Sequence, residues 1–264
     1  MSTPWSQTQL VNIMRPGYLQ LHASGLLKQR VEQAYEMLSH CSLCPRECGV
    51  NRLNGEKGYC QAGADPVVAS WNAHPWEEPP ISGTNGSGTI FFTYCTARCV
   101  FCQNYPISQL GIGQQVIVQR LAEMMLELQA RGCHNINLVT PTHFVPQILA
   151  ALAIAVEREL HLPLVYNSSG YEAVETLRLL DSLVDIYLPD AKYADNNIAH
   201  RLSGFRNYVE ANRAALKEMF RQVGTELLLD ENGIALRGMI IRHMVLPEGL
   251  AGTRQVLAWI AHEL

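Results

Sequence analysis

Three cysteines in one short segment, Cys95, Cys99 and Cys102, are the residues with the clearest capacity for chemistry. They directly follow an apolar run, residues 89–94, and their C-x3-C-x2-C spacing is short enough for one loop to wrap around one metal centre. Thiolates are the soft ligands typical of iron–sulfur clusters. A cubane 4Fe-4S cluster normally takes four cysteines, so three cysteines leave one iron open to a small molecule.

A zinc site or a set of buried thiols is the alternative explanation for this segment. A structural zinc site requires four protein ligands, whereas the loop supplies three cysteines and has no histidine nearby. The spacing, together with the preceding strand, therefore favours an iron–sulfur cluster with one open iron.

A second group of cysteines lies upstream, at Cys41, Cys44, Cys48 and Cys60. Two, three and eleven residues separate them, with glycine and proline among these, so the four thiols can enclose one metal centre. Four thiolates satisfy either a tetrahedral zinc ion or a second 4Fe-4S cluster. A metal-free loop is the third alternative, but such a segment would have little core to hold it.

Composition and charge narrow the functional classes. The chain has 264 residues, a net charge of −4 and eight cysteines, of which only Cys133 stands alone. Clustered cysteines without an export signal indicate metal ligands, and Cys133 is expected to be a buried apolar residue. The small charge gives no reason to expect nucleic acid or a membrane as partner. The longest apolar run, residues 148–156, is too short to span a bilayer, and we expect a cytoplasmic protein.

From residue 89 onward, expected strands alternate with expected helices. This repeat predicts an α/β fold with a parallel sheet and right-handed crossovers. Five strands, with none after the last helix, exclude a full eight-stranded barrel and predict a curved partial barrel with its site at the C-terminal strand ends. The expected strands cover residues 89–94, 135–140, 162–167, 183–188 and 237–246, and helical patterns cover residues 31–38, 120–131, 144–160, 171–180 and 253–264.

The part of the chain before the three-cysteine loop is expected to be a separate unit. We predict a helical, cysteine-rich, metal-binding extension over residues 1–88 and a partial barrel over residues 89–264. Residues 61–88 are rich in glycine and proline, so we expect a long functional loop there. Within it, Glu77 and Glu78 are expected to be a solvated acidic pair, with substrate binding as the alternative.

Several longer motifs, taken with the cysteine spacing, resemble one branch of the radical S-adenosylmethionine (radical SAM) enzymes. The branch is the uncharacterised homologues of pyruvate formate-lyase activating enzyme, and the resemblance covers nearly the whole chain from about residue 38. The hydrophobic Phe101 just before Cys102 belongs to it. The other matching motifs are Cys41-x2-Cys44-Pro-Arg-x-Cys48-Gly-Val-Asn-Arg52, Gly55-Glu-x-Gly58-x-Cys60, Glu77-Glu-Pro-Pro-Ile-Ser-Gly83, Gly86-Ser-Gly-Thr-Ile-Phe-Phe92 and Cys102-Gln-Asn-Tyr-Pro-Ile-Ser108.

The resemblance implies a (β/α)6 partial barrel in which Cys95, Cys99 and Cys102 hold a 4Fe-4S cluster. In that superfamily the amino and carboxylate groups of S-adenosylmethionine chelate the open iron. An electron from the cluster then cleaves the cofactor to a 5'-deoxyadenosyl radical, which abstracts hydrogen from a substrate. No side chain need act as an acid or base in the first step, because the cofactor performs the difficult chemistry.

The resemblance also implies which residues face S-adenosylmethionine. Most of them lie at the ends of expected strands, and for each one the alternative is an ordinary solvated polar residue. The implied positions are Phe101, near the adenine, and Asn104, Ser169, Asp190, Lys192, Arg242 and His243.

Two features depart from the activating enzymes. The segment Thr140-Pro-Thr-His143 stands where those enzymes carry a Gly-Gly-Glu whose backbone receives the methionine amino group. The chain also ends at Leu264, where the family continues into a sixth strand, so we expect a barrel that lacks this strand. A truncated, inactive homologue is accordingly one alternative to an active enzyme.

The substrate does not follow from the sequence. An activase-like attack on a glycine of a partner enzyme, a small molecule and a peptide are all open, and the missing basic patch disfavours nucleic acid. A reducing donor such as flavodoxin or ferredoxin is expected to supply the electron. This need for an electron path slightly favours iron–sulfur over zinc at the upstream cysteines. A non-catalytic iron–sulfur or zinc protein, such as an electron carrier, is the alternative from another functional class.

Overall fold

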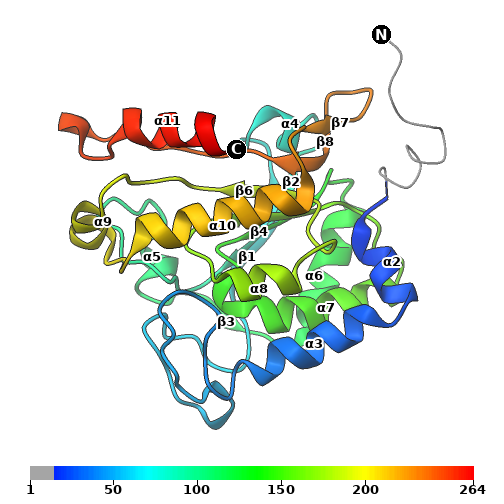
Figure 1. The fold of residues 1–264 in the computed structure, drawn as a ribbon. Coiled ribbons are helices and arrows are strands. Elements are labelled where there is room, and N and C mark those ends of the chain that lie inside the picture. The colour runs from blue at the N-terminus through cyan, green and yellow to red at the C-terminus, as the bar shows by residue number, and fades with distance from the viewer. Residues whose placement is uncertain (1–14) are drawn as a thin grey trace.

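A mixed eight-stranded sheet crosses the middle of the fold in the order β3-β1-β2-β4-β5-β6-β8-β7 (Figure 1). The structure is a computed structural model, and it describes residues 15–264. The strands are β1 (Val67–His74), β2 (Ser87–Phe92), β3 (Gln114–Gln115), β4 (Ile136–Val139), β5 (Leu164–Ser168), β6 (Ile186–Pro189), β7 (Leu228–Leu229) and β8 (Ala235–Met239).

The central strands form the expected parallel series. Strands β2, β4, β5, β6 and β8 pair in parallel, each with the next. Antiparallel partners extend the sheet, with β1 and β3 beyond β2 and with β7 beyond β8. The predicted α/β partial barrel with five parallel strands is therefore confirmed.

Helices cover the outer face of this sheet, with α10 in front of it and α3, α7 and α8 below it in Figure 1. The longer helices are α2 (Gly17–Ala23), α3 (Leu26–Glu36), α6 (Val118–Ala130), α7 (Val145–Glu157), α8 (Val174–Leu179), α9 (Asn196–Ser203), α10 (Tyr208–Val223) and α11 (Thr253–Glu263). Short turns complete the set: α4 (Pro79–Ser82), α5 (Tyr105–Ser108), η1 (Arg52–Asn54), η2 (Thr142–Phe144) and η3 (Pro247–Gly249).

Two apolar layers hold the sheet. On the outer face, the helix expected over residues 120–131 forms α6 and buries one amphipathic face, Leu121, Met124, Met125 and Leu128, in the core. On the inner face, α4 places Ile81 against a smaller cluster from β5, β6 and β8. The inner face thus has an apolar cluster of its own beneath α4.

Three sequence expectations need correction. Residues 67–74, expected to be part of a loop, form β1, because their backbone groups pair with β2. The helix expected over residues 31–38 begins earlier, as α3 from Leu26, and α2 precedes it, while residues 1–14 lie outside the described part. The last parallel strand is shorter than expected and ends at Met239, and Arg242 adds only an isolated bridge to Asp190. The division at residue 88 stays a prediction, although β1 shares the sheet with β2.

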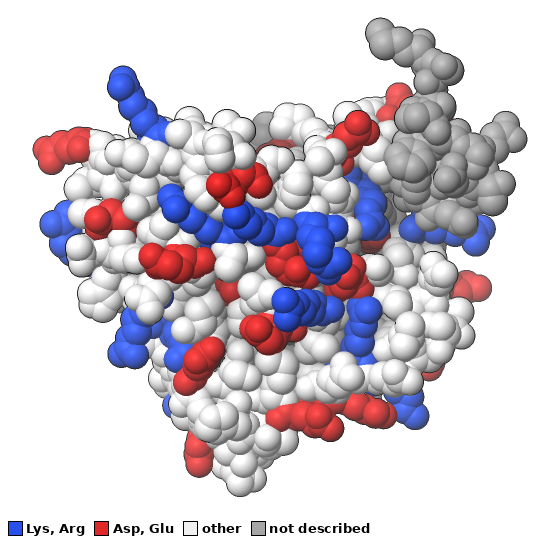
Figure 2. All heavy atoms as spheres, viewed as in Figure 1, with Lys and Arg blue, Asp and Glu red and all other residues white. Residues whose placement is uncertain are grey.

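Two surface features bear on partners. No helix in the described part of the chain is both long and apolar enough to cross a membrane. On the face shown in Figure 2, basic and acidic side chains are intermixed, so opposite charges alternate there.

Gly88 in β2 tests how tightly the sheet packs on α6. A Cβ there would lie 2.5 Å from the Asn135 carbonyl oxygen and 3.1 Å from Leu128 Cβ. We expect Gly88→Ala to lower the free energy of unfolding by about 1–3 kcal/mol, the usual cost of overpacking. Gly63→Ala is the matched control, because a Cβ at Gly63 meets nothing within 4 Å. Equal urea midpoints for the two variants would contradict this packing.

Candidate functional site

The three-cysteine loop begins at the C-terminal end of β2, where a partial barrel carries its site. Tyr94, just before Cys95, has a positive φ of 71°, so the chain turns sharply out of the strand. The Ala97 amide lies 3.4 Å from Cys95 Sγ, and Cys102 Sγ lies 3.1 Å from Ser108 Oγ. Backbone and hydroxyl groups therefore already face two of the three sulfur atoms.

The donor set fits an iron–sulfur cluster with one open iron. Burial raises the pKa of Cys95 to about 12 and also raises that of Cys99, so both are neutral thiols until a metal displaces their protons. Within residues 15–264, no three histidine, cysteine or acidic side chains converge on one ion position. A cubane does not require such convergence, because each of its thiolates binds a different iron.

A chain of charged side chains lies beside this loop at the ends of β6 and β8. Lys192 Nζ lies 2.6 Å from Asp190 Oδ2, and Arg242 Nε lies 3.3 Å from Asp190 Oδ1. The positive charge of Lys192 opposes the effect of burial on the pKa of Cys95 and of Cys99. Of the residues that the resemblance implies, the structure brings together Asp190, Lys192 and Arg242 next to the cysteines.

Glu77 and Glu78 continue this charged group, so their expected role as a solvated pair is wrong. Carboxylate oxygens of both residues lie 3.8 Å from Arg242 Nη1, and their side chains are only 11% and 26% exposed. Burial raises the pKa of Glu77, while Arg242 acts in the opposite direction. The buried atoms Glu78 Oε2 and Arg242 Nε have no hydrogen-bond partner, although Arg242 Nε forms an ion pair with Asp190. A polar ligand would supply the missing hydrogen bonds.

Two side chains of α10 hold the strand ends in place, and neither was predicted. The Tyr208 hydroxyl lies within hydrogen-bond distance of the Ser169 and Asp190 carbonyl oxygens and of the Lys192 amide. The Asn212 amide donates to the Asp190 carbonyl at 2.9 Å. Sequence patterns missed both residues because they lie on the buried face of an ordinary amphipathic helix.

The remaining implied residues have different surroundings. Phe101 is half-buried and packs on the aromatic cluster around Tyr171, whereas Asn104 is exposed before α5. Ser169 is half-buried, and its carbonyl accepts the bond from Tyr208. The ring of His243 is engaged by the Ala191 carbonyl and by Thr253 Oγ1, which ties the start of α11 to the sheet. That arrangement favours a structural role for His243.

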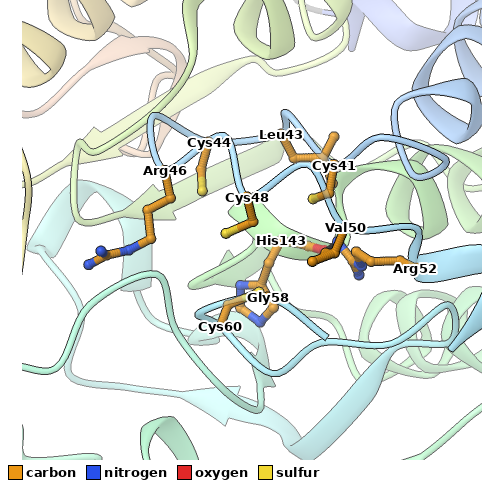
Figure 3. A pocket seen from close by; sticks show the side chains of 10 residues that line it. All are labelled: Cys41, Leu43, Cys44, Arg46, Cys48, Val50, Arg52, Gly58, Cys60 and His143. Atoms are coloured by element: carbon orange, nitrogen blue, oxygen red, sulfur yellow. Dashed lines mark hydrogen bonds between the residues drawn. The ribbon is translucent and has the colours of Figure 1, made fainter. Parts of the chain in front are cut away.

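The four upstream cysteines surround one small hollow that is partly open to solvent (Figure 3). Burial raises the pKa of Cys44 and of Cys60. The hollow is also lined by Arg46, Arg52, Gly58 and His143. The two cysteine groups therefore form two separate sites, each made from one segment of the chain.

His143 connects the hollow to the barrel. Its Nε2 lies 2.8 Å from the Thr93 carbonyl, so Nε2 carries the hydrogen, and its own carbonyl accepts a bond from Arg52 at 2.7 Å. Burial lowers the pKa of His143 to about 3, so the ring is neutral. The segment that departs from the activating enzymes thus packs against the cysteine-rich loop.

Comparison with known proteins identifies the family. Residues 89–232 match the sequence model of the Radical SAM superfamily, a span that contains the whole three-cysteine loop. The chain belongs to the radical SAM superfamily. A protein of Methanocaldococcus jannaschii, itself described as uncharacterised, is 30% identical over 249 residues, covering 91% of this chain and 67% of that protein. The radical SAM family implies a 4Fe-4S cluster and S-adenosylmethionine as cofactors, while the roles of individual residues stay predictions.

A variant of Glu172 tests whether burial raises the pKa of a carboxyl group inside the barrel. Its buried carboxylate accepts bonds from Thr142 and Tyr166, and burial raises its pKa from 4.5 to about 7. The folded state therefore retains a proton that the unfolded chain has lost, and stability falls as pH rises through this window. Between pH 4.5 and about pH 7, we expect the free energy of unfolding to fall by about 3 kcal/mol more in the wild type than in Glu172→Gln.

The measurement is urea unfolding of both proteins at several pH values, each prepared without metal. Gln keeps the shape of the side chain and cannot ionise, so it removes the pH-dependent contribution. The Gln NH2 group cannot accept a hydrogen bond, so one bond from Thr142 or Tyr166 is also lost, which changes stability equally at every pH. Parallel pH profiles for the two proteins would show that Glu172 does not carry a raised pKa.

Proposed function

We propose that this chain cleaves S-adenosylmethionine reductively at a cluster held by Cys95, Cys99 and Cys102, and that the resulting radical abstracts hydrogen from a substrate. The observation that carries the proposal is the position of this loop. It lies at the C-terminal end of the first parallel strand, beside the charged group of Asp190, Lys192 and Arg242. The cofactor requires a coordination position that three thiolates leave open, and it requires a polar surface next to that position.

The residues around the loop have separable tasks. When bound, the cluster supplies the electron that breaks the sulfonium carbon–sulfur bond. Asp190, Lys192 and Arg242 offer hydrogen-bond donors and acceptors to the polar parts of the cofactor. Phe101, supported by the aromatic cluster beneath it, offers an apolar surface for the adenine. None of these side chains needs to move a proton in this step.

The first test removes one ligand. Cys99→Ala, reconstituted anaerobically with iron and sulfide, is expected to form no 5'-deoxyadenosine when dithionite and S-adenosylmethionine are added. Cys133→Ala is the matched control, because Cys133 is buried far along the chain from both cysteine groups and is expected to retain turnover. Product formation by Cys99→Ala would refute the proposed ligand set, and bound iron without product in the wild type would favour a non-catalytic iron–sulfur protein.

The second test concerns cofactor binding. Asp190→Asn leaves the charges of Lys192 and Arg242 without their shared carboxylate, so both cations are misplaced. We expect the KM for S-adenosylmethionine to rise about tenfold or more, the usual effect of losing a hydrogen bond to a charged group. Asp181→Asn is the control, because Asp181 pairs with Arg221 at the surface. An unchanged KM in Asp190→Asn would remove this residue from the binding site.

We further propose that the substrate is a glycine-bearing segment of a partner protein, as in an activase. Two features support this: the sequence resemblance, and exposed apolar side chains beside the loop. Leu110 and Ile112 are 60% and 59% exposed, and the neighbouring Gln109 amide donates to the Cys99 carbonyl at 3.0 Å. Exposed apolar groups of this kind suit contact with a macromolecule. A reduced flavodoxin or ferredoxin remains the proposed source of the electron.

A glycyl-radical enzyme of the pyruvate formate-lyase type is the probe for this finer proposal. If the chain is an activase, its turnover should generate the doublet of a glycyl radical in the electron paramagnetic resonance spectrum. Formation of 5'-deoxyadenosine without that signal would oppose the activase assignment with this probe, and would leave the cleavage reaction intact.

A further inference from the structure

The proposed reaction does not use the four cysteines of the upstream loop, yet the structure gathers them around one hollow. Gly58 also lines this hollow, and a Cβ at that position would lie 2.9 Å from both Cys48 Cβ and Cys48 Sγ. The chain therefore has no room for any larger residue where the sulfur of Cys48 turns inward. Glycine at this position lets the backbone lie directly against the thiol.

Two arginines that line the same hollow carry charge without an acidic partner. Arg52 is 1% exposed, and its guanidinium donates only to the carbonyls of Gly63 and His143. Arg46 donates to the carbonyls of Thr96 and Gly204. Neither forms a salt bridge within residues 15–264. A buried cation requires compensating negative charge, and a metal centre with four thiolates would supply it.

An unsatisfied nitrogen gives a second, independent indication of a missing group. His143 is 2% exposed and lines the hollow, and its Nδ1 has no hydrogen-bond partner. Because Nε2 faces the Thr93 carbonyl, Nδ1 presents a bare lone pair. Buried polar atoms in folded proteins almost always have a partner. Thiolate and sulfide sulfur atoms only accept hydrogen bonds, so this nitrogen needs a hydrogen-bond donor, such as a water molecule, beside the metal centre.

The proposed reaction distinguishes between the two centres that four cysteines allow, and this choice rests on the proposed function. Zinc has no redox chemistry, whereas a second iron–sulfur cluster can pass an electron to the first. Arg46 and Arg98 hold the four-cysteine loop against the three-cysteine loop, where such a transfer is short. We propose that Cys41, Cys44, Cys48 and Cys60 hold a second 4Fe-4S cluster.

The second site is joined directly to the first. Arg46, between Cys44 and Cys48, donates to the carbonyl of Thr96, the residue after Cys95. From the other side, Arg98, next to Cys99, donates to the carbonyl of Tyr59, which precedes Cys60. Each cysteine loop therefore supplies one arginine to the backbone of the other, and the two centres are packed as neighbours.

The decisive experiment isolates the second site from the first. A Cys95→Ala/Cys99→Ala/Cys102→Ala variant of the full chain is reconstituted anaerobically with iron and sulfide, with zinc present in equal amount. We expect about four irons and four sulfides per chain, as for one cubane, and a new electron paramagnetic resonance signal after dithionite. This variant cannot cleave S-adenosylmethionine, so its metal content is independent of whether the proposed reaction occurs.

Matched variants complete the design. We expect about eight irons for the wild type and for Cys133→Ala, and about four for a variant with all four upstream cysteines replaced by alanine. Gly58→Ala, added to the variant that lacks Cys95, Cys99 and Cys102, keeps the four upstream thiols but crowds Cys48. Its iron content should be lower than that of the same triple variant carrying Gly63→Ala. One zinc per chain in place of iron, or no metal in a variant with a native circular dichroism spectrum, would overturn the proposal.

Discussion

Asp190 is the point at which the strand ends, the covering helix and the charged group meet. Its carboxylate pairs with Lys192 and Arg242, while its carbonyl accepts bonds from Tyr208 and Asn212 of α10. Its backbone also bridges to the segment after β8. One residue thus joins the ends of β5, β6 and β8 at the edge where we place the chemistry. Its half-buried carboxylate lies between two cations, so removing one of the three charges leaves the others without compensation.

Much of the framework follows from local patterns in the sequence. The apolar stripe of α6 and the alternation of short strands with helices predicted the parallel series, because burial of one helical face and of whole strands leaves a clear periodic signal. The cysteine spacing predicted that each group of cysteines comes together in one loop, because the members of each group lie close in sequence.

Other features could not be predicted, since their cause lies in distant partners. Strand β1 has an unremarkable pattern and exists because β2 offers it an edge. Glu77 and Glu78 read as a solvated pair until the fold brings Arg242 to them from the far end of the chain. Tyr208 and Asn212 likewise look like ordinary helix residues, and His143 gives no sign in sequence that it faces the cysteine-rich loop. Contacts across long sequence separations carry no local signal.

Tyr59 lies between the arginines that join the two cysteine loops. The guanidinium carbon of Arg46 lies 3.3 Å from the centre of its ring, and that of Arg98 lies 5.1 Å from it. Such stacking of cations on an aromatic face persists only while the ring keeps its place. Oxidative damage to the upstream loop would displace this ring and loosen the segment that carries Cys99. A disturbance of one cysteine loop would therefore reach the other loop beside it.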